Sequence, residues 1–280
     1  MASWLRKAGV SAGRLFVCFI PLSLFVGCGA DSAVTGTPVQ PSGIGGNWEF
    51  TATESTGATV PFGVALVLSG TTITGTAIPQ IAFPLNCTAN GCCGGPFAEF
   101  NTALTGTADA KGNLQLTSSV PNGGPIFTMS GVIAGGSLGS GTFTLTGACA
   151  AQGTISGVHY PNLNGTWAGT LVSKNTGSSY SATATLAQSA TLNSRGFFNV
   201  SATVNVSGDA CLGALTEGTP LEENSGFLGN SFGVTMNGAG GAIFSLEGAL
   251  AQDGKTFAAS YNAGGGSCAL DYGTGTLTLQ

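Results

Sequence analysis

The sequence predicts an all-β protein made of two tandem, homologous domains, each an antiparallel meander of strands. Three observations lead to this fold class. The 280 residues include 47 glycines but only 7% charged residues, so the charged side chains that usually cover a helical bundle are scarce. Apolar and polar residues alternate with a period of two in many segments, as in strands with one buried face. Finally, rare residues recur after a fixed number of positions, which indicates an internal repeat.

The alternation is clearest in the second half of the chain. Val200, Ala202, Val204 and Val206 are each separated by one polar residue, and this pattern places the four apolar side chains on one face of a strand. Segments of this kind are divided by glycine- and asparagine-rich turns, because these residues accept a positive φ. We count about eight strands in each copy and no convincing helix. The segment closest to a helix, residues 182–190, reads equally well as a strand.

The repeat is defined by residues that are rare in this chain. The tripeptide Gly-Asn-Trp at 46–48 returns as Gly-Thr-Trp at 165–167, a shift of 119 residues. The same shift relates Cys92 to Cys211 and Cys149 to Cys268. We therefore expect a first β domain over residues 44–157, a linker over 158–162 and a second β domain over 163–280. Each domain is of ordinary size.

The first 43 residues are predicted to be an export signal and a tether. Arg6, Lys7 and Arg14 precede an apolar stretch from Leu15 to Val26, which is the pattern of a signal peptide and is too short to span a bilayer as a helix. We assign residues 1–27 to this signal peptide. Residues 28–43 are small, polar and interrupted by proline, and they read as a flexible tether that begins with Cys28.

The end of the apolar stretch, Leu24-Phe25-Val26-Gly27-Cys28, resembles the lipobox of bacterial lipoproteins. The resemblance implies that Cys28 becomes the mature N-terminus and carries three acyl chains, palmitate among them, which would hold the protein on a membrane. Residue 29 is Gly rather than the Asp that retains such proteins in the inner membrane, so the resemblance implies an envelope protein anchored in the outer rather than the inner membrane. Cleavage by the ordinary signal peptidase after Ala30 is the alternative.

The charge of the mature chain excludes one class of partner. Without residues 1–27, four cations (Lys111, Lys174, Arg195 and Lys255) remain against 12 acidic residues, which gives 4 − 12 = −8. A chain of this charge cannot neutralise a row of phosphates, so we expect no nucleic-acid partner. We expect the membrane to be contacted through the lipid anchor, and the other partner to be an unknown small ligand or a component of the envelope.

The start of each copy carries a second resemblance. A first strand that opens with Gly-x-Trp, followed by about seven more strands in meander order, resembles lipocalin- and avidin-type β-barrels. The resemblance implies that Trp48 and Trp167 close one end of each barrel, either as core plugs or as the lining of a ligand cavity. An immunoglobulin-like β-sandwich is the alternative, although there the tryptophan lies between the two cysteines in sequence, whereas here it precedes both.

The six cysteines that follow Cys28 are predicted to form disulfides, as is usual in exported proteins. If equivalent residues pair equivalently in the two copies, Cys92 joins Cys149 and Cys211 joins Cys268. Cys87 and Cys93 would then pair within a local insert. A different arrangement, Cys87 with Cys149 and Cys92 with Cys93, stays open. The spacing of these cysteines is not that of a zinc site, so we expect no metal.

No set of residues suited to acid–base or nucleophilic catalysis is visible. The one histidine, His159, lies in the predicted linker, and the adjacent Glu222 and Glu223 would point to opposite faces of a strand. We therefore expect no enzyme and no cofactor. The function predicted from the sequence is a non-catalytic binding module for a small ligand or a surface partner. A structural or adhesive envelope protein is the alternative, and a hydrolase has the least support.

Overall fold

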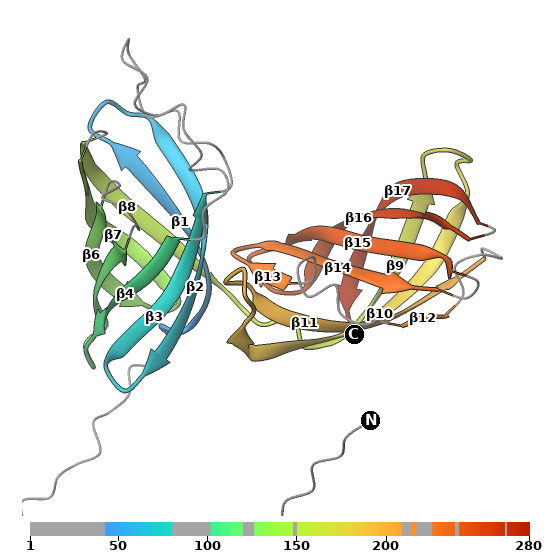
Figure 1. Cartoon of the computed structure of the whole chain (residues 1–280), viewed down its shortest axis with the longest axis horizontal. Coiled ribbons are helices and arrows are strands. Elements are labelled where there is room, and N and C mark those ends of the chain that lie inside the picture. Colours follow the sequence, from blue (N-terminus) through green and yellow to red (C-terminus); the bar gives the residue numbers. More distant parts are fainter. Residues whose placement is uncertain are drawn as a thin grey trace, which may run out of the picture. The chain divides into compact units, whose positions relative to one another are not determined.

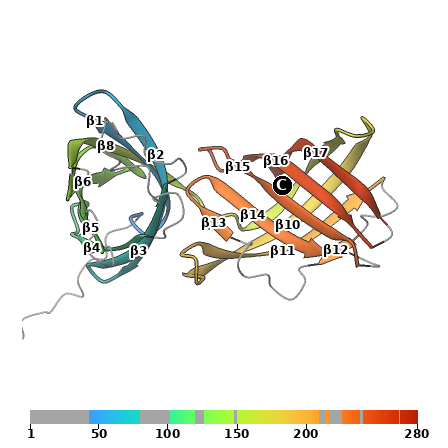
Figure 2. The same cartoon turned by 45° about the horizontal axis from the view of Figure 1, so that its top comes forward.

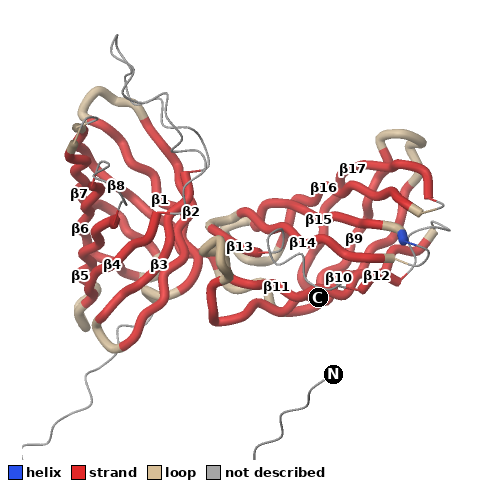
Figure 3. The backbone as a smooth tube through the Cα atoms, in the orientation of Figure 1, coloured by secondary structure: helices blue, strands red, loops and turns tan. Residues whose placement is uncertain are grey.

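The computed structural model describes residues 43–79, 102–119, 126–147, 150–208, 214–216, 226–238, 241–266 and 268–280. All of them belong to one compact unit, Pro38–Gln280. Nearly all of this chain is strand (Figure 3). No helix within these residues is long and apolar enough to cross a bilayer.

The first half of the chain forms a closed antiparallel barrel in which each strand pairs with the next one along the chain. Its last strand pairs with its first, which completes the ring seen in Figure 2. The eight strands are β1 (Gly46–Glu54), β2 (Thr59–Ser69), β3 (Thr72–Pro79), β4 (Thr102–Ala108), β5 (Asn113–Ser119), β6 (Ile126–Ala134), β7 (Ser137–Thr146) and β8 (Ala151–Tyr160).

The second half repeats this architecture (Figure 1). Two short strands, β12 and β13, both lie between β11 and β14 and together occupy one strand position. Pairing of β9 with β17 and of β10 with β11 closes the second barrel. Its strands are β9 (Gly165–Ser173), β10 (Ser179–Leu192), β11 (Phe198–Ser207), β12 (Ala214–Thr216), β13 (Gly226–Leu228), β14 (Ser231–Asn237), β15 (Ile243–Leu250), β16 (Thr256–Gly265) and β17 (Cys268–Leu279).

The predicted fold class is thus confirmed: the protein is all-β, with two tandem barrels of eight strand positions each. The immunoglobulin-like alternative is not the observed fold, because each sheet closes on itself instead of facing a second sheet. The ambiguous segment 182–190 lies within β10. In β11 the alternation appears as predicted, with the apolar side chains from Val200 to Val206 pointing into the barrel.

The interior of each barrel is filled by its own side chains. Aromatic residues contribute the largest fully buried groups, among them Trp48 and Phe50 in the first barrel and Trp167, Phe244 and Phe257 in the second. Burial of such apolar surface is the main stabilising contribution to a fold of this kind. The cores in the described residues are therefore packed structures.

Strand β2 departs from the alternating pattern. Its sequence, TVPFGVALVLS, is apolar at nearly every position, and it is buried on both faces. One face points into the first barrel, and the other carries Ala65, which packs with Phe198 and Leu228 of the second barrel. A Cβ atom added to Gly63 would lie 3.0 Å from Leu228 Cγ. Small residues on the outer face of β2 thus allow the second barrel to pack closely against it.

The repeat is visible in the strand boundaries. A shift of 119 residues carries β1 onto β9 and β7 onto β16. The two barrels differ at the seam where the first and last strands pair. In the first barrel Phe50 lies opposite Gly157, and its ring occupies the space that a side chain at Gly157 would need. In the second barrel the glycine is on the first strand, where Gly169 lies opposite Leu277.

The connection between the barrels is shorter than the predicted linker. Val158, His159 and Tyr160 belong to β8 and pair with β1, so only residues 161–164 connect the last strand of one barrel to the first strand of the next. Leu163, within this connection, is fully buried in the core of the second barrel.

Candidate ligand-binding site

Both tryptophans close their barrels as core residues. Trp48 Nε1 donates a hydrogen bond to the Ile44 carbonyl oxygen at 2.8 Å, and Trp167 Nε1 donates to the Leu163 carbonyl oxygen at 3.0 Å. Both indoles are fully buried, as are Ile44 and Leu163. The segment before each first strand therefore folds over the end of its barrel, and the indole N–H holds it there. Neither tryptophan lines the cleft described below.

Most of the other predicted site residues lie outside the described part of the chain. These are Cys28, Cys87, Cys92, Cys93, Cys149 and Cys211. Cys268 is the first residue of β17, opposite Gly265, and its side chain is not described. Within the described residues no group of three or more His, Cys, Asp or Glu side chains could hold a metal ion.

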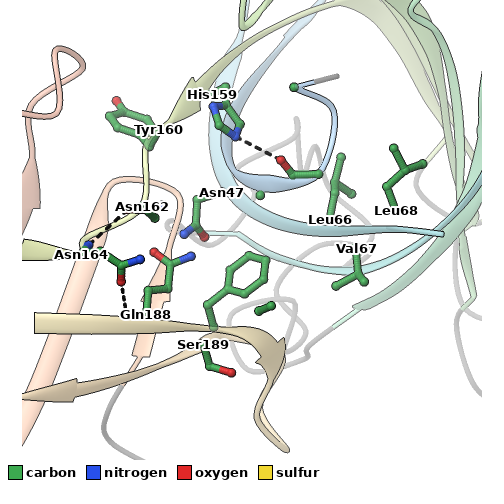
Figure 4. Close-up of a pocket in the computed structure, with 15 residues that line it drawn as sticks. Asn47, Leu66, Val67, Leu68, His159, Tyr160, Asn162, Asn164, Gln188 and Ser189 are labelled. Carbon is green, nitrogen blue, oxygen red and sulfur yellow. Dashed lines mark hydrogen bonds between the residues drawn. The ribbon is translucent and has the colours of Figure 1, made fainter. Parts of the chain in front are cut away.

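A cleft of about 730 Å³ lies where the first barrel, the connecting segment and the second barrel meet. Its volume is in the range of small-molecule sites. The first barrel contributes the start of β1, the end of β2 and the end of β8, and the second contributes β10 and Phe198 of β11. Figure 4 shows the side-chain amides of Asn47, Asn164 and Gln188 gathered on one side of the cleft and Val67, on the outer face of β2, on the other. Leu66 and Leu68 point from the opposite face of β2 toward the core of the first barrel.

Three of the amides are held in place through their oxygen atoms. Gln188 Oε1 accepts a hydrogen bond from the Leu163 backbone N–H at 3.2 Å. Asn164 Oδ1 accepts from the Gln188 N–H at 2.6 Å, and Asn162 Oδ1 accepts from the Asn164 N–H at 3.2 Å. Within the described residues the amide nitrogens of these side chains make no hydrogen bond. Each is therefore a neutral donor, oriented by its own oxygen.

Asn47 is the unusual member of this group. It lies on the outer side of β1, where alternation would expose it, yet its side chain is only 1% exposed. Neither its Oδ1 nor its Nδ2 atom has a hydrogen-bond partner. A buried polar group without a partner costs about 1–3 kcal/mol. A polar group that entered the cleft and bonded to Asn47 would offset this cost.

His159 lies at the edge of the cleft in its neutral form. Its Nε2 atom is 3.1 Å from the Gly45 carbonyl oxygen, and because a carbonyl can only accept, we place the ring proton on Nε2. The ring also meets Trp48 edge-on, with centroids 5.1 Å apart. Burial is the main cause that lowers the pKa of His159 below its ordinary value, against the smaller raising effect of the Gly45 carbonyl. The imidazole therefore adds no positive charge at neutral pH.

Tyr160 completes the polar side of the cleft. Burial, followed by the nearby Glu49 carboxylate, raises the pKa of Tyr160. The phenol is thus neutral at physiological pH. Asp, Glu, Lys and Arg are also absent from the residues that line the cleft. The lining is therefore polar but uncharged, with the Glu49 carboxylate close to Tyr160.

Little in the sequence indicates this site. Asn47 alternates with Trp48 and Phe50 and so reads as an exposed strand residue, and Asn162 and Asn164 read as ordinary linker residues. The one available signal was the missing alternation in β2, which indicates a strand covered on both faces. His159 is the single histidine of the sequence, and the structure places it in a strand rather than in the predicted linker.

Comparisons with known proteins add no functional assignment. No family model matches the chain, and the search of curated proteins found no match either. Among solved structures, a Bacteroides fragilis protein provisionally named an outer membrane protein is 11% identical, with 85% of this chain and 98% of that chain covered and a TM-score of 0.25. Kievitone hydratase from Nectria haematococca is 12% identical, with 87% and 92% covered and a TM-score of 0.22. Likeness at these TM-scores carries no inference about this protein.

Proposed function

We propose that this protein is an exported, lipid-anchored, non-catalytic binding module whose ligand occupies the cleft between its two barrels. The observation that carries the proposal is Asn47, a buried amide without a partner at the wall of an uncharged cleft. Natural cores rarely retain such a group unless it has a role. Asn162, Asn164 and Gln188 line the same cleft and would bind the same ligand.

The barrel interiors are less suited to this role. Lipocalin-type barrels hold their ligands inside the ring of strands, but here the described interiors are filled by aromatic and aliphatic side chains. The tryptophans that could have lined such cavities pack instead against the closing segments. The polar groups that lack partners lie outside the rings, at the junction of the barrels. This arrangement favours the cleft as the binding site.

The decisive experiment replaces Asn47 with leucine, which keeps the branching of the side chain and removes its polar atoms. We expect Asn47→Leu to raise the free energy of unfolding by about 1 kcal/mol, because an unsatisfied buried amide is removed. The same change should eliminate any ligand that copurifies with the full chain, as measured by native mass spectrometry. A residue with a purely structural role would not combine gained stability with lost binding.

The matched control is Asn205→Leu, which makes the same substitution at an exposed position on the outer face of β11. It should change neither stability nor copurified ligand. The proposal would be refuted if Asn47→Leu destabilised the protein and left a bound ligand in place, or if the wild-type chain bound no ligand under any condition tested.

The anchor is a separate part of the proposal and rests on the lipobox resemblance of residues 24–28. With the acylated cysteine replaced, in Cys28→Ser, no chains would remain to bury methylene groups, each of which contributes about 0.8 kcal/mol to membrane binding. We expect this variant to appear in the soluble fraction, whereas the wild-type protein sediments with membranes. Sedimentation of both would contradict the anchor without affecting the assignment of the cleft.

A further inference from the structure

The structure assigns a chemical class to the ligand of the cleft: we infer that it is a segment of a neutral oligosaccharide. This inference rests on the proposed function and adds the identity of the ligand. It is drawn from the charge of the cleft, the kind of hydrogen-bonding groups in its wall and the contrast between its two sides.

The absence of charge among the lining residues excludes several ligand classes. A phosphate, a carboxylate or an ammonium group enters a partly buried site only if an opposite charge compensates for lost hydration. The cleft offers no Asp, Glu, Lys or Arg, and His159 is neutral because burial lowers its pKa. Nucleotides, phospholipid headgroups and acidic sugars would all lose hydration here without compensation.

The wall formed by Asn47, Asn162, Asn164 and Gln188 matches hydroxyl and ether oxygens. Three of these side chains offer N–H donors whose direction is fixed, because their oxygens accept from backbone N–H groups. Asn47 offers both a donor and an acceptor without a partner. A hydroxyl group also donates and accepts, so an amide and a hydroxyl can satisfy each other fully. A ligand that presents several hydroxyls along one edge would use the whole wall.

The opposite side of the cleft is apolar, which fits the other surface of a sugar ring. Val67, on the outer face of β2, lies across from the amides (Figure 4), and Phe198 of β11 also lines the cleft. A pyranose has C–H groups on its faces and hydroxyls around its edge, so one face can pack on this side while the edge meets the amides. A lipid chain would instead leave the buried amide of Asn47 without a partner, at the cost of an unsatisfied buried group.

A peptide is less suited to this place. Extended peptides bind most simply by adding a strand to a free sheet edge, and the described strands of both barrels are paired around closed rings. A peptide would therefore have to bind through side chains alone, in a site without charges for its termini or its charged residues. An oligosaccharide can hydrogen-bond to the amides of the cleft, and it does not require a free edge of a β-sheet.

The test is binding of the purified full chain to an array that carries neutral oligosaccharides (gluco-, manno-, xylo- and N-acetylglucosamine series), acidic polysaccharides and peptides. We expect binding to at least one neutral series and to none of the acidic ones. Because no charge takes part, affinity measured by calorimetry should change less than about twofold between low and high salt. The separate neutral series also distinguish an N-acetylated envelope glycan from an external polysaccharide.

Variants connect the binding to the cleft. Asn47→Leu, which breaks no existing hydrogen bond, should weaken the affinity at least about tenfold, and Gln188→Ala should weaken it about fivefold, as expected for loss of one neutral hydrogen bond. Gln152→Ala, at an exposed position of β8, is the control and should bind as the wild type does.

Two outcomes separate this inference from the function on which it rests. If the chain binds no neutral glycan, but a different copurified ligand is lost in Asn47→Leu, the oligosaccharide is wrong and the binding cleft stands. If a neutral glycan binds equally well to wild type, Asn47→Leu and Gln188→Ala, the protein recognises glycans elsewhere, and the cleft is wrong for both proposals.

Discussion

His159 illustrates how one side chain is defined by its surroundings. It lies near the end of β8, opposite Trp48, with its Nε2 atom against the Gly45 carbonyl oxygen. Gly46 must be a glycine here, since its φ is +122° and an added Cβ would lie only 2.5 Å from His159 Nε2. The ring is therefore partly buried beside Gly46 and Trp48, and this burial disfavours the charged form.

The lowered pKa of His159 predicts that the first barrel is sensitive to mild acid. In the unfolded chain the histidine takes up its proton near its ordinary pKa of 6.5, while the folded protein resists protonation to lower pH. The unfolded state thus binds more protons between the two values, so this contribution to stability is complete above pH 6.5 and is lost as the pH falls below it.

The measurement is urea unfolding of the wild type and of His159→Gln, whose side-chain amide can still donate to the Gly45 carbonyl. The wild type should lose more stability than the variant between about pH 7.5 and about pH 5.5, which spans the ordinary histidine range. Equal losses in the two proteins would show that the histidine is not the group responsible.

For single residues, the sequence predicts the role of the two tryptophans but not the burial of Asn47, and the difference has a physical reason. The Gly-x-Trp resemblance implied end-closing tryptophans, and their position in the core follows from their own size and local sequence. Asn47 could not have been found in this way. It lies on the outer face of β1, and its burial does not follow from the pattern around it.

Among the elements, strands buried on one face were the most predictable. The alternation in β7, β11 and β15 follows directly from one wet and one packed face, so the period of two is present in the sequence. The division of one strand position between β12 and β13 left no such signal, because three residues each are too few to establish a period. The apolar run of β2 did carry a signal, and it corresponds to the partner on its outer face.

At the level of the whole molecule, the number of barrels was predictable and their contact was not. Duplication of Gly-x-Trp and of two cysteines predicts two copies of one fold. The contact uses Ala65 on one side and Phe198 and Leu228 on the other. The two barrels use different residues for this contact, so it does not recur at equivalent positions of the two copies. Comparison of the copies in the sequence therefore cannot reveal it.

This contact predicts that the barrels stabilise each other. Ala65 has no exposed surface, so Ala65→Glu would bury an unpaired carboxylate, at a cost of several kcal/mol. We expect the variant to lose the contact and the shape of the cleft with it. Scanning calorimetry should then show the two barrels unfolding at separate temperatures, with the wild type unfolding in one transition.

Ala103→Glu is the matched substitution, because Ala103 is exposed on the outer face of β4. It should leave the calorimetric trace of the wild type unchanged. A single unshifted transition for Ala65→Glu as well would mean that the barrels are energetically independent.

The two seams also bear on how a newly made chain avoids pairing its strands wrongly. The route from β1 to β17 is about twice as long as that from β1 to β8, and doubling a loop costs only about 0.6 kcal/mol, so chain entropy hardly opposes an exchange of closing strands. The residues do oppose it. If β1 paired with β17 in the same register, Phe50 would lie opposite Leu277, and two large side chains would compete for one space. If β9 paired with β8, Gly169 would lie opposite Gly157, and the space between them would be left without a side chain. The large residue is on the first strand of one barrel and on the last strand of the other. Each first strand therefore packs well only against the last strand of its own barrel.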